Sequence, residues 1–275
     1  CVESADSLIQ ACEAEGITAL PGFEANTSEG IHLIALFPEG TSLAEVNAAI
    51  GACGATPSCA SGTPGKPFVE IVEEVSRRSG LVVAAHVNAP SGLLKATAGQ
   101  PLATMWKHDQ LHAVAVSPGL ALDANEQAIL DNKSPLCRRP HAVAVLHADD
   151  ICHPDRLSQS GGTTWLKASA ASLDGLRMAV RTPSTRISLL DPGEQSHPVL
   201  VAVSWQGGFL DDVSIRFNPS LNALIGGRGT GKSTVVESLR FALGLEPIGA
   251  AAQRDHQSFI QKVLTDGTTV QLLVE

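Results

Sequence analysis

The sequence predicts an α/β protein in two parts, because two patterns follow one another along its 275 residues. Before residue 190, short apolar segments of strand length alternate with amphipathic segments of helical period, which is typical of a mainly parallel α/β layer or barrel. After it, two strand-like segments lead into a glycine-rich loop and a helix. Asp191-Pro192-Gly193-Glu194 lies between the two patterns and is the best linker candidate. We therefore expect one domain over residues 1–190 and another over residues 191–275.

The elements of the first part follow from periodicity and turn residues. Ser42 and Glu45 have the spacing of a capping box and open a helix. A second helix over residues 67–79 places an apolar residue at every third or fourth position, and Gly80 ends it. Residues 51–66 are rich in Gly, Pro, Ser and Thr and indicate a loop. The other expected elements are a helix over 2–16, strands over 17–20, 31–37, 81–85, 112–116 and 141–146, and a helix around Leu173, Leu176 and Val180.

Composition excludes several classes of protein. A hydrophobic fraction of 44% and a charged fraction of 17% are those of a globular domain. The net charge of −9 argues against a surface that coats nucleic acid generally, but it leaves room for a local basic groove. Six cysteines without a C-x-x-C pair predict neither a zinc ribbon nor a disulfide framework. No apolar run has the length of a membrane span, so we expect a cytoplasmic protein without a membrane partner.

The second part carries the pattern G-x-x-x-x-G-K-[ST] in the context that its chemistry needs. The apolar segment Leu221–Ile225 precedes it as an expected strand, and helical spacing of apolar residues follows Lys232 until Gly244. Paired strands are expected over residues 199–205 and 213–217, and a last strand over 269–275. The candidate nucleotide-binding residues are those of the loop itself: Gly226, Gly227, Arg228, Gly229, Thr230, Gly231, Lys232, Ser233 and Thr234.

This loop predicts binding of ATP with Mg²⁺. Glycines let successive backbone N–H groups turn toward a phosphate chain, and the helix N-terminus adds partial positive charge. Lys232 would reach the outer phosphates, the Ser233 hydroxyl would complete the magnesium shell, and Arg228 is best interpreted as solvated. Hydrolysis also needs an acidic residue at the end of another strand. No segment after Thr234 has that pattern, so we expect the sequence to end inside its nucleotide domain.

Acidic residues and histidines follow or open several strands of the first part. Glu24, His32, His86 and the pair Asp149-Asp150 occupy such positions, and these residue types can hold metals that activate water. A plainer interpretation stays open, because a lone histidine at a strand end is usually a hydrogen-bonded structural residue and the aspartates could cap a turn. The structural interpretation is preferred for three other histidines: His108, His112 and His141.

Short motifs in the right order resemble a known family. Pro21–Glu24, Gly30–Phe37 and Ala85–Asn88 resemble the polymerase-and-histidinol-phosphatase (PHP) metallo-phosphoesterase domain. Thr163–Lys167, the Leu176 helix and Gly226–Leu243 are similar to proteins that join such a domain to an ATPase of the chromosome-maintenance and repair type, which has an ABC-type head. The resemblance covers nearly the whole chain, and its phosphate loop is the most specific part.

The resemblance implies the C-terminal part of a distorted (β/α)7 barrel, followed by the start of a P-loop ATPase head. It implies that Glu24, His32, His86 and Asp150 hold Mn²⁺, Fe²⁺ or Zn²⁺. Two departures follow from the sequence. Cysteine stands in Asp150-Ile151-Cys152-His153 where the family has histidine, and the family's opening His-x-His motif does not occur before Glu24. The sequence is therefore expected to be an internal part of a longer protein, and its catalytic residues are not assigned.

Two functions are consistent with these features. The first is an ATPase of the ABC and DNA-repair type coupled to a PHP phosphoesterase that acts on nucleic acid, with a homodimer formed through the ATPase head. The second is a nucleotide-dependent binding or scaffold module whose PHP domain is degenerate and non-catalytic. The cysteine at position 152 favours the second function. Stoichiometric metal that depends on Glu24 would favour the first.

Overall fold

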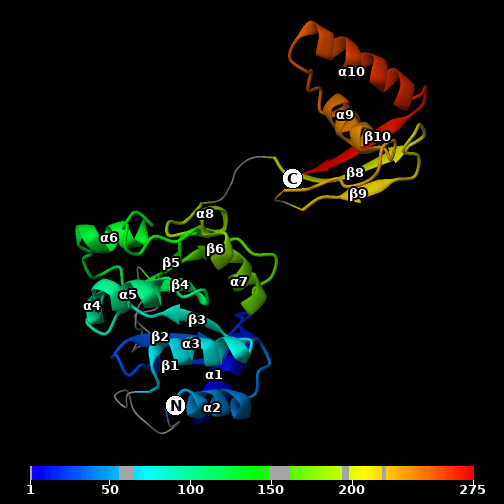
Figure 1. Cartoon of the computed structure of the whole chain (residues 1–275). Helices are drawn as coiled ribbons and strands as arrows, with labels where there is room; N and C mark the ends of the chain where they lie inside the picture. Colours follow the sequence, from blue (N-terminus) through cyan, green and yellow to red (C-terminus); the bar gives the residue numbers. More distant parts are fainter. Residues whose placement is uncertain (1, 56–64, 149–161, 194–197, 219–220) are drawn as a thin grey trace. The chain divides into compact units, whose positions relative to one another are not determined.

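The computed structural model describes residues 2–55, 65–148, 162–193, 198–218 and 221–275. The chain divides into two compact units, Cys1–Gly193 and Glu194–Glu275, and the division falls within the linker candidate. Figure 1 shows the elements of both units. Among the described residues, no helix is long and apolar enough to span a membrane.

The first unit contains the alternation of strands and helices that the sequence predicts. The capping box is present, with α2 beginning directly after Ser42, and α3 and α7 also lie where expected. The elements are α1 (Val2–Ala14), β1 (Gly22–Asn26), β2 (His32–Leu36), α2 (Leu43–Ala52), α3 (Phe68–Arg77), β3 (Leu81–Ala84), α4 (Leu93–Ala96), α5 (Gly99–Trp106), β4 (Leu111–Val116), α6 (Ala124–Leu130), β5 (Ala144–His147), β6 (Trp165–Leu166), α7 (Leu173–Arg181), α8 (Pro183–Arg186) and β7 (Ile187–Ser188).

Five strands form one sheet in the order β1-β2-β3-β4-β5. β3, β4 and β5 are parallel, whereas β1, β2 and β3 are antiparallel. The expectation of a mainly parallel layer is therefore corrected to a mixed sheet. The reason is the short turn between β1 and β2, where the Thr27 amide donates to the Ile31 carbonyl at 2.8 Å, since a parallel connection needs a crossover of a dozen residues. The structure shows the α/β class, and the barrel stays a prediction.

The prediction of a first strand over residues 17–20 is wrong. These residues have no strand structure, and β1 begins at Gly22 instead. Ile17 is exposed, and the preceding pairing position is taken by Pro21, whose carbonyl accepts from the Phe37 amide at 2.8 Å. Proline has no amide to donate, so the ladder with β2 extends no further back. Glu24 consequently lies within β1 and not after it.

Helices cover both faces of the sheet. On one face α2, α3, α4, α5 and α6 pack against a core that includes Phe68, Trp106 and Leu111. On the other face α7 packs against β3 and β4 through Leu173 and Val180. Carboxylates distant in sequence cap two of these helices. Glu29 accepts from the first amide of α3, at 3.0 Å, and Glu39 accepts from the Leu173 amide of α7 at 2.9 Å. Such contacts satisfy orphan amides and favour the helix N-terminus.

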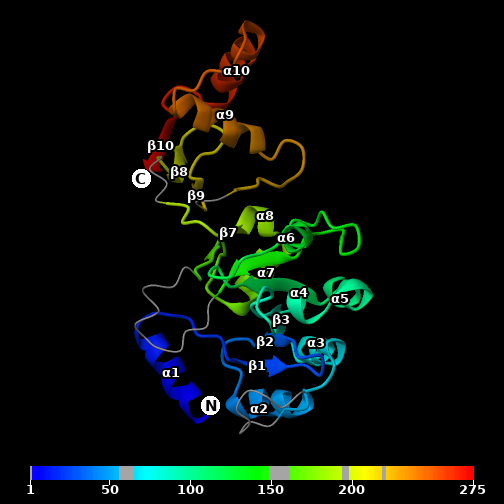
Figure 2. The same cartoon turned by 90° about the vertical axis from the view of Figure 1, so that its left-hand side faces the viewer.

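The second unit is a three-stranded antiparallel sheet with two helices. Its elements are β8 (Leu200–Gln206), β9 (Ser214–Arg216), α9 (Lys232–Ala242), α10 (Ala250–Val263) and β10 (Thr269–Val274), and the strand order is β10-β8-β9. These elements confirm the paired strands, the helix after the glycine loop and the last strand. Figures 1 and 2 show α9 between α10 and the strands. Val203, Trp205 and Val235 form the buried centre of this unit.

The strand expected directly before the glycine loop is absent. Residues 221–225 have no strand structure, and Leu221 and Ile225 are 91% and 94% exposed. A strand is stable only when a neighbour pairs with it, and no described strand lies alongside this segment. The apolar residues of this segment indicate that it could form a strand, but they do not indicate which strand would pair with it.

Candidate nucleotide loop and metal cluster

The glycine loop enters α9 through a backbone conformation that suits glycine. Gly231 is the N-cap of α9 and has φ of 89° and ψ of 4°, in the left-handed region. A side chain there would be strained, and its Cβ would also lie 3.1 Å from the Phe209 ring and 3.2 Å from Leu210. The loop thus turns sharply into a helix of 11 residues, whose first amides have no intrahelical partner.

Lys232 folds back over the loop. Its Nζ donates to the carbonyl of Gly226 at 2.8 Å and to that of Gly227. The Thr230 hydroxyl donates to the same Gly227 carbonyl at 3.0 Å. The ammonium is therefore held at the inner side of the loop, beside the start of α9. This arrangement places the cation and the free helix amides together, as a phosphate-binding loop requires.

The two hydroxyl residues after Lys232 have different environments. Ser233 is exposed. Thr234 is buried, and its carbonyl accepts a 2.7 Å hydrogen bond from the Ser238 hydroxyl. Of the pair, Ser233 is the accessible one, and its contact with a magnesium ion stays a prediction. Arg228 is exposed, in agreement with a solvated side chain.

Two residues that the sequence did not single out hold α9 against the sheet. The indole Nε1 of Trp205, on β8, donates to the Ser238 hydroxyl at 2.9 Å, and both residues are buried. On the other side of α9, Glu237 contacts His256 of α10 and pairs with Arg240 at 3.0 Å. No known sequence motif predicts a hydrogen bond between a tryptophan on a strand and a serine on a later helix. The contacts become apparent only when β8 and α9 are placed together.

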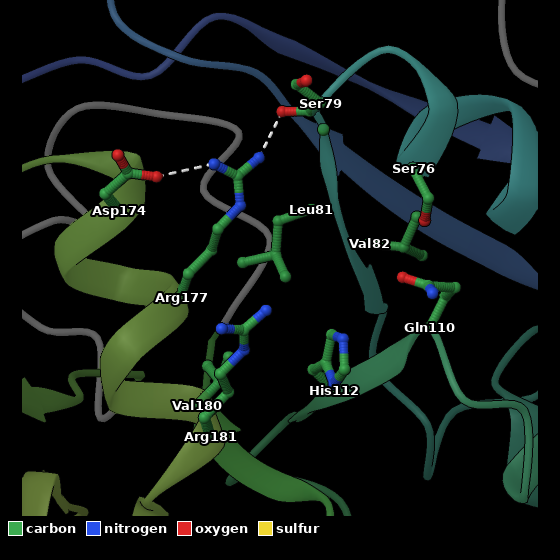
Figure 3. A pocket seen from close by; sticks show the side chains of 11 residues that line it. Ser76, Ser79, Leu81, Val82, Gln110, His112, Asp174, Arg177, Val180 and Arg181 are labelled. Carbon is green, nitrogen blue, oxygen red and sulfur yellow. Dashed lines mark hydrogen bonds and ion pairs between the residues drawn. The ribbon is translucent and has the colours of Figure 1, made fainter.

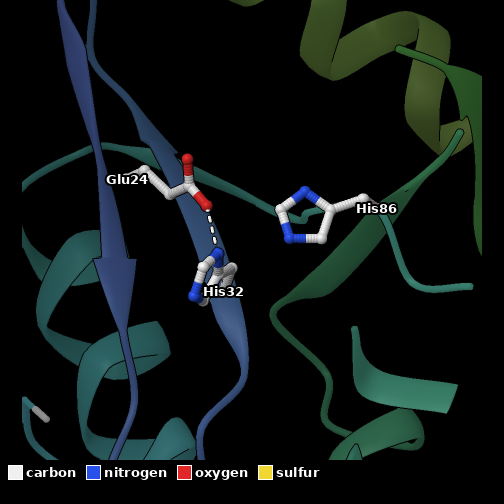
Figure 4. Close-up of side chains that lie close together, drawn as sticks. All are labelled: Glu24, His32 and His86. Carbon is white, nitrogen blue, oxygen red and sulfur yellow. Dashed lines mark ion pairs between the residues drawn. The ribbon is translucent and has the colours of Figure 1, made fainter. Parts of the chain in front are cut away.

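Three of the four expected metal ligands lie together in the first unit. One ligand atom each from Glu24, His32 and His86 lies within 4.8 Å of the other two. Oε1 of Glu24 is 2.6 Å from Nδ1 of His32, and the ring centroids of His32 and His86 are 5.1 Å apart. Figure 4 shows the His86 ring pointing toward the other two side chains. The fourth expected ligand, Asp150, lies outside the described residues, as do Asp149, Cys152 and His153.

Strand register explains how Glu24 and His32 meet. Asn26 pairs with His32 and Glu24 pairs with Ile34, so Glu24 and His32 are diagonal neighbours on one face of the hairpin. Diagonal neighbours are within reach of long side chains. His32 begins β2, which is antiparallel to β3, so it lies at the edge where β3 ends. His86 follows that end, and the adjacent Ala85 amide donates to the His32 carbonyl at 3.0 Å.

The backbone around His86 is unusual. Its φ is 26°, which side-chain-bearing residues rarely adopt. Its carbonyl is approached so closely that a Cβ on Gly92 would lie 2.2 Å from it. Glycine at position 92 therefore permits the turn that holds the imidazole in place. Nε2 of His86 is 3.0 Å from the Ser91 hydroxyl, which orients the ring. Strain of this kind occurs at functional sites, and here it coincides with the cluster.

The donor set fits a divalent metal. Nδ1 of His32 is buried and makes no hydrogen bond within the described residues, even though Glu24 Oε1 is close by. Imidazole nitrogen and carboxylate oxygen bind zinc at about 2.0–2.2 Å, so two ligands of one tetrahedral ion lie about 3.4 Å apart. The three ligand atoms lie within 4.8 Å of one another, so the side chains would have to close in by about 1 Å around a bound ion. A buried imidazole nitrogen, a carboxylate oxygen and a second imidazole that lie this close together form a donor set that fits a metal site.

The remaining histidines and a nearby amide have other surroundings. His108 lies 4.0 Å from Glu73, and neither His112 nor His141 lies in the cluster. Asn88, which follows His86 by two residues, donates to the carbonyls of Ser117 and Leu120. It also accepts from the Ser117 amide at 3.0 Å. Asn88 thus joins the ends of β3 and β4 and supports the edge that carries His86, a role the sequence did not indicate.

Comparison with known proteins identifies part of the second unit. The model of a family described as an AAA domain matches residues 206–271. Residues 206–271 are a P-loop ATPase-type region. The matched segment contains the glycine loop and both helices of the unit. No curated protein matches the chain. No solved structure matches it either.

Proposed function

We propose that this protein binds ATP with Mg²⁺ at residues 226–234 and that it is an ATPase of the ABC and repair type. The observation that carries this proposal is the Lys232 ammonium, held against the Gly226 carbonyl beside the Gly231-capped start of α9. The AAA match over the same segment supports it. The backbone amides that begin α9 would bind phosphate oxygens, Lys232 would neutralise the outer phosphates, and Ser233 would contact the magnesium ion.

The same proposal gives the first unit a metal-dependent phosphoesterase role of the PHP type. Glu24, His32 and His86 would hold the metal, which is Mn²⁺, Fe²⁺ or Zn²⁺, and Asp150 would complete the set. A metal bound there supplies a hydroxide nucleophile near neutral pH and polarises a phosphoester. The chain's own contribution is to orient the imidazoles, through Ser91 for His86 and through the β1–β2 register for His32. The substrate that this proposal favours is nucleic acid.

A second function keeps the nucleotide site but not the phosphoesterase chemistry. In it the first unit is a degenerate PHP domain that recognises a partner, and the ATPase part controls that recognition. The feature in its favour is Cys152 at the position where the family has histidine. Thiolate binds zinc well but would alter a site suited to harder metals. The two functions therefore differ in metal content and in hydrolysis.

One experiment separates them. The full chain is purified without chelator, its metal content is measured by mass spectrometry, and hydrolysis of bis(p-nitrophenyl) phosphate is followed with added Mn²⁺. The phosphoesterase function requires stoichiometric metal and hydrolysis, both lost in Glu24→Ala and kept in Glu15→Ala, an exposed carboxylate after α1. Metal without hydrolysis in the wild type supports the scaffold function. Absence of both from the wild type would contradict the metal site itself.

The homodimer belongs to the same proposal. ATPase heads of this type associate around bound nucleotide, so sedimentation velocity with and without ATP should show a nucleotide-dependent shift from one copy to two. A Lys232→Ala chain should remain a monomer under both conditions. A dimer that is equally populated without ATP and in the variant would show that association is independent of the nucleotide loop.

A further inference from the structure

Two adjoining pockets lie at the end of the sheet where β3 and β4 begin, opposite the strand ends that carry the metal cluster. One, of about 410 Å³, is lined by the first residues of β3 and β4 and by the end of α7. The other, of about 440 Å³, is lined by the start of β4 and by the segment that precedes β5. Both are lined by His112, Val180 and Arg181, so the two pockets adjoin at these residues, and we describe them together as one groove. Figure 3 shows Arg177 and Arg181 extending from α7 toward the strands that carry Leu81 and His112.

The groove is positively charged in a chain whose net charge is −9. Among the described residues, five lysines and arginines line it together with two aspartates, Asp109 and Asp174. We call it the basic groove, defined by Lys107, Arg138, Arg139, Arg177, Arg181 and His112. Because the protein as a whole is acidic, the positive charge of this groove comes from the local arrangement of its lysines and arginines and not from the overall composition.

The cations of the basic groove differ in what they already contact. Arg177 pairs with Asp174 at 2.7 Å and donates to the Ser79 carbonyl. Arg139 donates to the carbonyls of Trp106 and His108. Within the described ranges, by contrast, the side chains of Lys107, Arg138 and Arg181 make no hydrogen bond or ion pair. Two arginines are thus fixed as part of the wall, while three cations are available to a ligand.

His112 is placed in the groove by an irregularity of the sheet. The β3–β4 register passes from Val82↔Leu111 to Val83↔Ala113, which leaves His112 as an extra residue on β4. Such bulges re-aim a side chain and are common beside functional sites. Burial lowers the pKa of His112, and the charges of Arg181 and Arg139 lower it further, while Asp109 opposes them. The positive charges of the groove therefore disfavour protonation of His112.

The chemistry of the groove indicates its ligand. Guanidinium groups match phosphate oxygens in geometry and charge. No phenylalanine or tryptophan lines either pocket within the described part of the chain, where the aromatic lining consists of His112 and His141. The cations therefore make phosphate the main contact, and phosphate contacts carry no sequence information directly. The two adjoining pockets also offer room for more than one phosphate.

We propose that the basic groove binds the phosphodiester backbone of a nucleic acid, without sequence preference. In naming nucleic acid, the proposal rests on the proposed function. The site is distinct from the metal cluster, since Leu81 begins β3 in the groove and His86 follows its other end, roughly 16 Å away at 3.3 Å per residue. The groove would thus anchor the strand at one edge of the sheet, away from the edge where a phosphoester would be cleaved.

The test is fluorescence anisotropy of a labelled thirty-nucleotide oligo-dT with the full chain, in EDTA and without ATP. The double variant Arg138→Glu/Arg181→Glu should bind at least tenfold more weakly than the wild type. Its slope of log affinity against log salt should be shallower by about 0.7 for each phosphate that the variant no longer neutralises. The matched control is Arg254→Glu/Lys262→Glu, which makes the same charge change on α10 and should bind as the wild type does. Equal weakening in both double variants would overturn the proposal.

Two further arms complete the test. Inorganic phosphate should compete with the oligonucleotide only at concentrations far above those of the nucleic acid. If the wild type binds phosphate in a groove-dependent way but not the oligonucleotide, the groove is a small-anion site and the proposal fails. Glu24→Ala should bind the oligonucleotide normally, because it lies outside the groove. Loss of hydrolysis in Glu24→Ala with intact binding supports both proposals, and intact binding without any hydrolysis in the wild type would refute only the phosphoesterase.

Discussion

The indole nitrogen of Trp205 and the hydroxyl of Ser238 form a buried 2.9 Å hydrogen bond that joins β8 to the helix after the glycine loop. The same hydroxyl donates to the Thr234 carbonyl at 2.7 Å, one turn earlier on α9. Ser238 therefore connects the core of the second unit to the residues directly behind Lys232 and Ser233. The position of the nucleotide loop depends on a polar contact inside an otherwise apolar centre.

Replacing Ser238 by alanine should destabilise the second unit. The substitution leaves the buried Trp205 N–H without a partner, which costs about 1–3 kcal/mol. Urea unfolding followed by fluorescence of the full chain should show an earlier transition. In a double-mutant cycle, Trp205→Phe removes the donor as well, so Ser238→Ala should cost less in that background. Equal costs in both backgrounds would show that the hydrogen bond contributes nothing.

Lys232→Ala should weaken ATP binding by roughly tenfold or more, because it removes the charge that meets the outer phosphates. The measurement is a calorimetric titration of the full chain with ATP and Mg²⁺. Lys262→Ala, which removes a lysine from the last turn of α10, is the matched control and should leave the affinity unchanged. Unchanged affinity in Lys232→Ala would refute the assignment of the loop.

Gly92→Ala should disturb the metal cluster without touching a ligand side chain. Its Cβ would lie 2.2 Å from the His86 carbonyl oxygen and 2.5 Å from the Val87 carbonyl, so the His86 turn must shift. We expect a loss of stability of about 1–3 kcal/mol, typical of overpacking, together with weaker metal binding. Thermal unfolding and Mn²⁺ titration measure the two effects. Gly119→Ala, where an added Cβ meets nothing within 4 Å, should change neither. A destabilised Gly92→Ala that binds metal as the wild type does would remove His86 from the site.

Local sequence signals predicted the elements whose formation is decided locally. The Ser42–Glu45 capping box, the amphipathic α3 and the loop-to-helix junction at Gly231 all follow from residues within one or two turns of each other. The strand predictions failed where pairing decides. Residues 17–20 and 221–225 are largely apolar, yet neither segment pairs with a described strand. An apolar segment can form a strand, but it does so only where an adjacent strand is available for pairing.

The candidate sites divide in the same way. The nucleotide loop is a continuous motif, and the structure brings its Lys232 back to the Gly226 carbonyl, while the contact of Lys232 with phosphates stays a prediction. Glu24 and His32 meet because of the β1–β2 register, which could not be foreseen while Glu24 was expected after a strand ending at residue 20. The basic groove combines Arg138, Arg181 and the bulged His112 from three separate segments. No spacing rule connects such residues, because a bulge and two pocket walls are properties of the folded chain.

Acid should weaken the capping of α2 through Glu45. The Ser42 hydroxyl and the Ser42 amide both donate to the Glu45 carboxylate, at 2.7 Å and 2.9 Å, and these hydrogen bonds hold the pKa of Glu45 below its ordinary value. Because the pKa is lower in the folded chain than in the unfolded one, the unfolded chain takes up the proton first. The stabilisation is therefore present above the unfolded pKa of about 4.3 and is lost as the pH falls through the folded value.

Glu45→Gln should reveal this contribution. Glutamine keeps the shape and one acceptor of the cap but cannot titrate, so the variant should be less stable than the wild type at about pH 7. Between about pH 6 and pH 3 the thermal midpoint of the wild type should fall more steeply, and the two curves should converge in acid. Glu15→Gln, at an exposed position after α1 without a side-chain hydrogen bond in the described ranges, should run parallel to the wild type. If the Glu45→Gln curve is equally parallel, the reciprocal cap does not stabilise α2 in solution, whatever its geometry.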